Sequence, residues 1–469
     1  MFGLILKKHT MRLFVWLLAA LVCQNAVAQV EDSLLIKNLS DEILLRSTAY
    51  ENLRVLCKTV GGRLAGSPNM LKAESWGQKT LEQAGADRVW LQECLVPHWE
   101  RGGTDSAWYS VKGNGNQKVR LDILALGNSV GTGEKGILLP AILVQDFADL
   151  EQKKDQVKGK IVVFNNVFNN TYLETFLSYV DDGIYRRSGP SRAAKYGAAA
   201  VMIRSITGST DNNPHTGSTA YDSTQPKIPA AAMGLKDADQ LIALLKSGKQ
   251  VDIYYRSGAN FKPDATGHNV IGEWKGTEFP DQYITVGGHL DSWDPAEGAH
   301  DDGTGCVHSI EVLRALKAMG YKPRHTIRVV LFANEENGLR GGRKYAQEAV
   351  SKNEKHVFAL ESDAGGFTPR GFSFSFSEEQ LNKLRRWLPF FEPRGVHRFT
   401  TGGGGADVSP LNALLKTPVA ELTPDGSRYF DLHHARNDVF EQVNKRELDL
   451  GALNMAILIY LVDKYGLEQ

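Results

Sequence analysis

Residues 282–338 read QYITVGGHLDSWDPAEGAHDDGTGCVHSIEVLRALKAMGYKPRHTIRVVLFANEENG, and this stretch decides the predicted fold. It opens with the apolar run QYITVGG, which is typical of a buried strand. A loop leads to TGCVHSIEVLRALKAM, where apolar positions recur with helical spacing, and a second apolar run, HTIRVVLFAN, follows. Strand, helix and strand in this order predict two parallel strands joined by a helical crossover.

The same alternation extends from residue 268 to the end of the chain. Further strands are predicted at HNVIGEWKG (268–276), HVFALESD (356–363) and TPVAELTP (417–424). Helices are predicted at 339–351, 378–391 and 448–466, and two more at 39–58 and 69–84. We therefore expect an α/β fold with a mostly parallel central sheet and helices on both of its faces.

Between residues 118 and 258 the pattern changes to short β-rich runs, such as VRLDILAL, GILLPAILV and KIVVFNN, separated by Gly, Asn and Asp turns. A helix at about 235–245 and a strand near 251–255 close this part. Domain insertion is tolerated where chain ends lie close together. We therefore interpret 118–258 as a β-rich module inserted into a larger domain formed by 29–117 and 259–469.

Residues 1–28 have the features of a secretory signal peptide. Basic residues precede an apolar run over 13–22, and the small residues Ala26 and Ala28 suit a cleavage site. The run is too short to span a bilayer as a helix. We expect a secreted or periplasmic protein with no membrane span in the mature chain. Lipidation at Cys23 is the weaker alternative, because a valine precedes it where a small residue is usual.

Charge and cysteine content limit the function classes. Lys and Arg number 54 and Asp and Glu number 54, so no net field attracts nucleic acid, and we expect no such partner. Without the signal, Cys57, Cys94 and Cys306 remain. A Cys57–Cys94 disulfide and free thiols both stay open. Cys306 lies in an apolar helical pattern and is interpreted as a packed thiol.

Polar donors follow the predicted strands where each strand ends. In an open α/β sheet, functional side chains gather beyond the carboxyl ends of the strands. Taken singly, such residues are usually solvated or helix-capping groups. Carboxylates buried together at the rim of a sheet, however, must be paired or coordinate a metal. The sequence therefore predicts a metal site at this edge, formed by His289, Asp301, Glu335, Glu336, Asp363 and His434.

The donor types favour zinc, since they combine carboxylate and imidazole without thiolate and offer too few oxygens for calcium. One shared carboxylate can hold two ions about 3.5–4 Å apart. Asp291 is expected to accept the second N–H of His289 and so orient its ring. Asp302 is interpreted as a cap of the following helix. Glu335 and Glu336 point to different sides, so one can be a ligand and the other a general base.

A resemblance rests on five short motifs: H-x-D at 289–291, DDGTG at 301–305, NEENG at 334–338, ESDAGG at 361–366 and HHARND at 433–438. Together they resemble the di-zinc exopeptidase family of aminopeptidase S and carboxypeptidase Q, most closely its carboxypeptidase Q (plasma glutamate carboxypeptidase) branch. The likeness covers the whole mature chain, because that branch also carries a protease-associated domain at the place of the β-rich module. It implies a zinc exopeptidase fold and suggests a homodimer.

Position by position, the resemblance implies two zinc ions per chain, bridged by Asp301. It implies that His289 and Asp363 complete one site, and that Glu336 and His434 complete the other. Glu335 would be the base that takes a proton from a metal-bridging water and passes it to the leaving amine. The resemblance also implies a cis peptide between Asp301 and Asp302.

Two further features stay open. Aminopeptidase S has a tyrosine just before the last ligand, where this chain has His433, so His433 and Tyr429 are both hypotheses for the oxyanion donor. The Gly-rich stretch 400–410 neither follows a predicted strand nor opens a predicted helix, which disfavours a phosphate loop. We expect a flexible substrate-facing loop, with Asp407 as a partner for a substrate amine, or a solvated turn.

The sequence thus predicts a zinc-dependent exopeptidase that hydrolyses dipeptides or short peptides. The alternative from another class is a catalytically inactive receptor or binding protein on the same scaffold. It is disfavoured because the complete set of proposed ligands and the base is present. Glutaminyl cyclase chemistry, on a related fold with a single zinc, is disfavoured by the bridging aspartate. Aminopeptidase or carboxypeptidase preference stays open.

Overall fold

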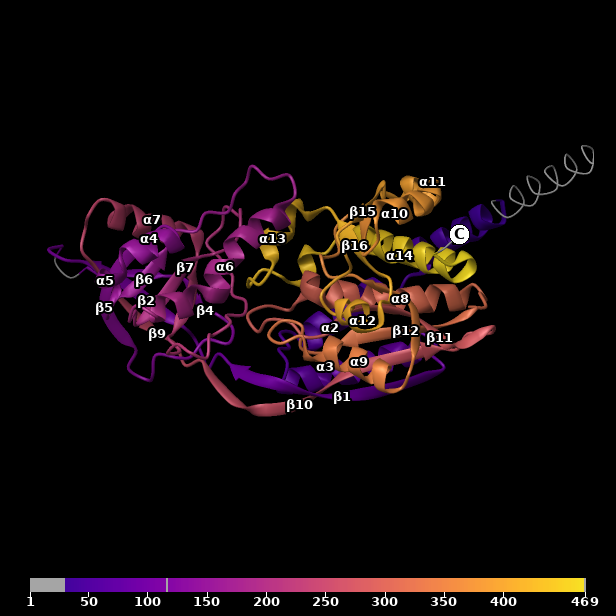
Figure 1. The fold of residues 1–469 in the computed structure, drawn as a ribbon, viewed down its shortest axis with the longest axis horizontal. Helices are drawn as coiled ribbons and strands as arrows, with labels where there is room; N and C mark the ends of the chain where they lie inside the picture. The colour runs from indigo at the N-terminus through magenta and orange to yellow at the C-terminus, as the bar shows by residue number, and fades with distance from the viewer. Residues whose placement is uncertain (1–29, 115–116, 468–469) are drawn as a thin grey trace, which may run out of the picture.

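The computed structural model describes residues 30–114 and 117–467. It consists of two lobes, each built on an eight-stranded sheet (Figure 1). The predicted signal peptide and Cys23 lie outside the described residues. Within the described ranges, no helix has the length and apolar character needed to cross a membrane.

The first lobe contains the predicted central sheet, with strand order β1-β10-β12-β11-β13-β16-β14-β15. The strands are β1 (Arg88–Glu100), β10 (Asn260–Trp274), β11 (Phe279–His289), β12 (His325–Phe332), β13 (Lys355–Glu361), β14 (Pro369–Phe374), β15 (Arg398–Thr401) and β16 (Val419–Pro424). Strands β12, β11, β13 and β16 run parallel in the centre. Strand β10 is antiparallel to β1 and β12, and β14 is antiparallel to β16. The predicted α/β fold is confirmed.

Helices cover both faces of this sheet (Figure 1). One face carries α2 (Ala49–Thr59), α3 (Pro68–Gln83), α8 (Thr304–Ala318) and α14 (Lys445–Tyr465), and the other carries α9 (Arg340–Ser351) and α12 (Ser409–Leu415). Strand β12 shows how the faces divide, because Val329 and Leu331 belong to the first core and Val330 and Phe332 to the second. This alternation is the period of two that a strand imposes.

Two predicted helices are interrupted. The helix expected over 39–58 is instead a helix over 30–46 followed by α2, because the Ser47 hydroxyl accepts the backbone N–H of Ala49 and starts a new helix. The helix expected over 378–391 consists of α10 (Glu378–Leu384) and α11 (Leu388–Phe391), with a tighter turn between them. Pro389 lies in the first turn of α11, where a backbone N–H would have no partner within the helix, so the N–H that proline lacks is not needed.

The second lobe has strand order β3-β2-β9-β5-β6-β7-β8-β4. Its strands are β2 (Ser106–Val111), β3 (Val119–Leu121), β4 (Ile123–Ala125), β5 (Ile137–Val144), β6 (Ile161–Phe164), β7 (Ala200–Arg204), β8 (Ala230–Met233) and β9 (Val251–Arg256). Helices α4 (Phe147–Gln152), α5 (Lys154–Val157) and α6 (Thr175–Ala194) pack on one face and α7 (Leu235–Lys246) on the other. Because β2 pairs with β9, this sheet begins upstream of the expected boundary at 118.

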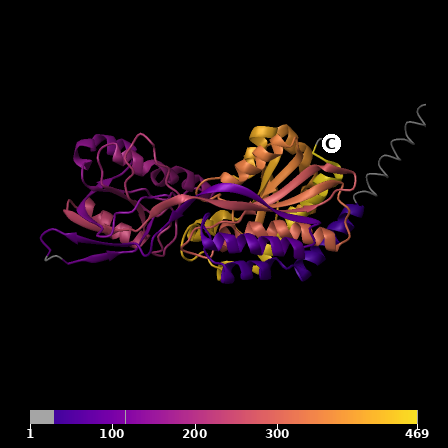
Figure 2. The same cartoon turned by 90° about the horizontal axis from the view of Figure 1, so that it is seen from below.

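The two lobes are joined by the long antiparallel pair of β1 and β10, which runs from the first lobe toward the second (Figure 2). Glu100 at the end of β1 pairs with Asn260 at the start of β10. The chain therefore enters and leaves the second lobe on neighbouring strands.

The three cysteines of the described residues are buried free thiols. The alternative of a Cys57–Cys94 disulfide is therefore not realised in this structure. Cys306 is fully buried, as its apolar helical setting predicts, and its thiol donates to the carbonyl oxygen of His289 at 3.1 Å.

Candidate metal centre and cleft

The predicted donors meet at the carboxyl edge of the parallel strands. His289 is the last residue of β11, Glu335 and Glu336 follow β12, and Asp363 follows β13. Asp301 lies in the turn before α8. His434 comes shortly after the short helix α13 (Tyr429–Leu432). The structure also contains the cis peptide between Asp301 and Asp302 that the resemblance implied.

The donor atoms form two groups that share one carboxylate. In the first group, His289 Nε2 lies 3.2 Å from Asp301 Oδ1 and 3.2 Å from Asp363 Oδ1. In the second, His434 Nε2 lies 3.3 Å from Asp301 Oδ2 and 3.1 Å from Glu336 Oε2. Asp301 thus directs one oxygen to each group.

These groups fit divalent cations in size and charge. A tetrahedral zinc ion with bonds of about 2.0–2.1 Å spaces its ligand atoms roughly 3.3 Å apart. Asp301 Oδ2 and Glu336 Oε1 are buried without a hydrogen-bond donor. Burial, and then the negative charge of Asp301, raise the pKa of Glu336 well above its ordinary value. Cations between the carboxylates would remove this penalty.

The ring of His289 is oriented by a backbone group rather than by the expected carboxylate. His289 Nδ1 lies 2.9 Å from the carbonyl oxygen of Asp291, but 3.8 Å from its Oδ1. The Asp291 carboxylate instead accepts the backbone N–H groups of Glu335 and Glu336, at 3.0 and 3.3 Å. Both of its oxygens are therefore engaged in holding the end of β12. A proton on Nδ1 leaves the Nε2 lone pair facing Asp301.

Asp302 has the capping role that the sequence predicts. Its Oδ1 accepts the backbone N–H of Gly305 in the first turn of α8, at 2.9 Å, and its Oδ2 accepts that of His289, at 3.0 Å. Asp302 is fully buried beside the first donor group. It thereby ties the last residue of β11 to the start of α8.

Two positioning residues were missed by sequence reasoning. Asp438 is buried and accepts the backbone N–H groups of His300 and Asp301 at 2.7 and 3.1 Å. Its spacing from His434 in HHARND was the only signal. Arg63 is fully buried, and its guanidinium donates to the carbonyl oxygens of residues 290, 297 and 298 in the loop before Asp301. A lone arginine far upstream gives no motif that could have revealed this role.

The other two carboxylates of the loop form ion pairs on its outer side. Asp294 pairs with Arg101, with both contacts at 2.7 Å, and Glu297 pairs with Lys58 at 2.7 Å. They are thus separate from the two donor groups.

Glu335 lies next to the donor groups and lines the cleft in front of them. Within the described residues, no hydrogen bond reaches its carboxyl group. Burial is the main cause that raises the pKa of Glu335 to about 8, and the charge of Asp363 adds to it. A carboxyl group so placed can accept and release a proton at the cluster.

His433 and Tyr429 lie beside the second donor group. The His433 ring stacks on that of His434 with centroids 3.5 Å apart, and its Nε2 is 3.7 Å from Asp301 Oδ2. The Tyr429 and His433 rings are 5.1 Å apart, and both residues line the cleft. Burial lowers the pKa of His433 to about 3, so its ring is neutral.

The Gly-rich stretch 400–410 differs from expectation. It follows β15 and leads into α12, and none of its residues is among those that line the cleft. The backbone N–H groups of Asp407 and Val408 donate to Glu361, so a protein carboxylate already uses these donors. A Cβ at Gly405 would lie 2.3 Å from the Glu361 carboxyl carbon, which explains a glycine there. Asp407 is fully buried and is not brought to the cleft.

The cleft above the donor groups is a cavity of about 930 Å³ with walls from both lobes. The second lobe contributes aromatic and basic side chains: Phe176, Tyr179, Arg186, Arg187 and Tyr221. It also holds the loop of His434, because the Thr216 N–H donates to the His434 carbonyl at 3.0 Å and the Thr216 carbonyl lies 3.2 Å from His434 Nδ1. The second lobe is therefore part of the candidate site.

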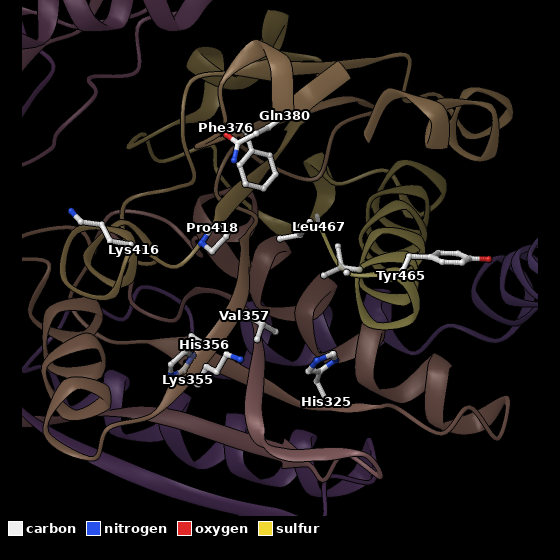
Figure 3. A pocket seen from close by; sticks show the side chains of 12 residues that line it. His325, Lys355, His356, Val357, Phe376, Gln380, Lys416, Pro418, Tyr465 and Leu467 are labelled. Carbon is white, nitrogen blue, oxygen red and sulfur yellow. The ribbon is translucent and has the colours of Figure 1, made fainter. Parts of the chain in front are cut away.

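A second cavity, of about 640 Å³, lies at the opposite end of the same strands. Figure 3 shows His325 and Lys355, which begin β12 and β13, on one side of it, and Phe376 and Leu467 on others. None of its lining residues belongs to the donor groups.

Comparisons with known proteins agree with this geometry. Residues 269–459 match the family model described as peptidase family M28. Carboxypeptidase Q from Xenopus laevis is 35% identical over 420 residues, which cover 89% of this chain and 86% of the relative. The solved structure of a peptidase M28 precursor from Shewanella amazonensis matches with a TM-score of 0.85 and 32% identity, over 92% of this chain and 96% of that one. A zinc aminopeptidase from Bacillus subtilis shares the fold, with a TM-score of 0.62 and 21% identity, over 89% of this chain and 95% of its own.

Proposed function

The chain belongs to peptidase family M28 and is a metallopeptidase, and from this premise we propose that it is a zinc-dependent exopeptidase that hydrolyses dipeptides or short peptides, as the likeness to carboxypeptidase Q suggests. The observation that carries this proposal is the Asp301 carboxylate, whose two oxygens face separate groups of donors. A single carboxylate in this position can hold two cations at the spacing that peptide hydrolysis uses.

In this proposal, Asp301 would hold both zinc ions, one with each carboxylate oxygen. His289 and Asp363 would complete one site, and Glu336 and His434 would complete the other. Imidazole and carboxylate donors without thiolate favour zinc, and the related fold from Bacillus subtilis is named a zinc aminopeptidase. When bound, two such ions would polarise the peptide carbonyl and lower the pKa of the attacking water.

Glu335 is the proposed general base. Its carboxyl group opens into the cleft without a protein partner, so it can take a proton from the attacking water and pass it to the leaving amine. Tyr429 and His433 are the proposed hydrogen-bond donors to the developing oxyanion. Replacing the one that acts by phenylalanine should lower turnover far more than zinc content.

The finer predictions about domains and location extend this proposal. We propose that the second lobe, including β2 (Ser106–Val111), is a protease-associated domain, inserted between the parts of a catalytic domain that lie before Ser106 and from residue 259 onward. We also propose that residues 1–28 direct export, which would place the enzyme in the periplasm or outside the cell. A homodimer stays a prediction from the family resemblance.

Metal analysis and peptide hydrolysis by the same preparation test the proposal. Purified protein should contain about two zinc ions per chain. It should hydrolyse unblocked dipeptides, lose this activity to a chelator and regain it with zinc. Asp301→Asn should lose metal and activity together. A protein that binds both ions but hydrolyses no peptide would instead support the inactive binding protein.

A further inference from the structure

The charged groups that line the cleft fall into two sets. The carboxylates among them, Asp301, Glu335, Glu336 and Asp363, all belong to the proposed metal ligands and base. The cations are Arg186, Arg187, Lys227 and Arg343. No further carboxylate of the described residues lines this cavity to pair with a substrate ammonium group. The cations, in contrast, offer a choice of partners for a substrate carboxylate.

Three of these cations are engaged or stand at the rim. Arg186 is buried and donates to the Tyr179 hydroxyl at 2.5 Å and to the Thr216 carbonyl at 3.4 Å. Lys227 is exposed and lies over the Phe261 ring, 5.3 Å from its centroid. Arg343 is exposed on α9, in the first lobe.

Arg187 differs from all three. It is half-buried on α6, and no carboxylate of the described residues pairs with its guanidinium. The group is held above Gly183, one turn earlier, where a Cβ would lie 2.8 Å from Arg187 Nη1. Burial, and then the charge of Arg186, lower the pKa of Arg187, and a nearby anion would offset both effects. An unpaired, prepositioned guanidinium in a cleft suits bidentate binding of a carboxylate.

We propose that Arg187 binds the terminal carboxylate of the peptide substrate and thereby makes the second lobe select peptides with a free C-terminus. The inference rests on the proposed exopeptidase function and adds its specificity-determining residue. The carboxylate is held by the second lobe while the scissile bond lies at the donor groups of the first. The distance between the lobes would then limit how much peptide can follow the scissile bond.

Steady-state kinetics with one dipeptide in three forms test this inference. The forms are the free dipeptide, its C-terminal amide and its N-acetyl derivative. The wild-type enzyme should cleave the free form roughly 30- to 100-fold better than the amide in kcat/KM, since a charge-assisted contact is lost. Arg187→Gln should lose a similar factor on the free form, mainly through KM, and change hydrolysis of the amide by less than about threefold.

Matched variants separate charge from position. Arg187→Lys keeps the charge without the planar guanidinium, so its kcat/KM for the free dipeptide should lie between those of the wild type and Arg187→Gln. Gly183→Ala should displace the guanidinium and raise KM for the free form only. Arg192→Gln is the control, because Arg192 lies on the same helix, is exposed and does not line the cleft. Wild-type enzyme that cleaves the amide as well as the free form, or an Arg343→Gln variant that alone removes the preference, would overturn the inference.

A binding measurement keeps this inference distinct from the proposed function. Titration calorimetry of wild-type and Arg187→Gln protein with phenylalanine and with phenylalaninamide, at equal zinc content, should show that only the acid loses affinity in the variant, by about tenfold or more. Protein that hydrolyses no peptide, yet shows this difference, would refute the exopeptidase and retain the carboxylate site. Active protein whose wild-type and Arg187→Gln forms bind phenylalanine equally well would refute the carboxylate site and retain the exopeptidase.

Discussion

The buried carboxylates at the two ends of the parallel strands differ in their hydrogen bonding: those at the amino end are paired, whereas those at the carboxyl end have oxygens without a donor. At the amino end, Asp463 accepts hydrogen bonds from the Tyr321 hydroxyl at 2.7 Å, from the backbone of Arg324 and His325 at 2.8 Å each, and from the His325 ring at 2.9 Å. Glu354, just before β13, accepts from Arg328 and His356. Each oxygen of these two carboxylates has a donor.

At the carboxyl end, carboxylates face one another instead. Asp301 Oδ2 and Glu336 Oε1 have no donor, and no hydrogen bond of the described residues reaches the Glu335 carboxyl group. Such an arrangement is costly without cations. One sheet therefore carries a charge network that stabilises the fold at one end and a charge cluster that favours metal binding at the other. Changes at the two ends should separate activity from stability.

The largest contrast is expected between two isosteric changes, one at each end. Glu335→Gln should lower kcat by roughly 10²- to 10⁴-fold, because a general base is lost while zinc binding remains. Its free energy of unfolding should stay the same or rise, since a half-buried carboxyl group without a hydrogen-bond partner is removed. Glu354→Gln is the matched control: it should lower the free energy of unfolding and leave kcat unchanged. Peptide hydrolysis, metal content and urea unfolding of both variants would measure this, and an active Glu335→Gln enzyme would remove the base assignment.

Metal removal should affect stability through the carboxyl end alone. Zinc at about 100 times its dissociation constant should raise the free energy of unfolding by roughly 3 kcal/mol per independent site. Thermal unfolding with chelator and with added zinc would show the shift. Asp301→Asn should abolish it, whereas Asp463→Asn should keep it. An equal zinc-induced shift in both variants would contradict the placement of the metals at Asp301.

The central strands could be predicted because they are buried on both faces, which leaves continuous apolar runs such as those of β11 and β12. Strands at the borders were missed. Strand β1 is an edge strand that mixes charged and apolar residues and has a bulge next to Pro97. Strand β15 has only four residues, too few to show a period. Missing β15 also led to the wrong expectation that the Gly-rich stretch follows no strand.

The donors of the first lobe could be predicted because each follows a strand whose end the sequence marks. The basic wall of the cleft could not. Arg186 lies 248 positions from His434, whose ring its guanidinium approaches, and α6 carries Pro190 and a weak apolar pattern. A contact between the two lobes leaves no periodic pattern of apolar residues in the local sequence. The choice of backbone carbonyl over carboxylate at Asp291 was likewise hidden, because residue identity does not say which atom accepts.

A change at the amino end alone should destabilise without inactivating. Asp463→Asn removes the charge that accepts four hydrogen bonds and should cost about 3–5 kcal/mol, as breaking a buried charge network does. Urea unfolding should give this difference. At temperatures where the variant is folded, its kcat per folded molecule and its zinc content should equal those of the wild type. A loss of zinc would show that the two ends are coupled, against the separation inferred above.

The smallest effect is expected from acid. Although burial acts in the other direction, hydrogen bonds from His356 and Arg328 lower the pKa of Glu354 to about 2, from an ordinary 4.5. A carboxyl group with a depressed pKa stabilises the native state above its unfolded pKa, so this contribution is lost as pH falls from about 4.5 to about 2. Burial lowers the pKa of His356 below its ordinary 6.5. As the pH falls below about 6.5, the unfolded chain therefore binds a proton at His356 before the native state does, and the free energy of unfolding decreases there as well.

Both groups act in the same direction, and after allowance for solvent screening the Glu354 contribution should be about 1–2 kcal/mol. Urea unfolding between pH 7 and pH 3, with the metal removed by a chelator, isolates the Glu354 contribution, because the release of metal as its ligands are protonated no longer affects stability. Glu354→Gln should flatten the dependence below pH 4.5 and keep the part between pH 6.5 and 4.5 that belongs to His356. An unchanged slope below pH 4.5 would mean that other carboxylates dominate there, and the amino end would then owe its stability to the Asp463 network alone.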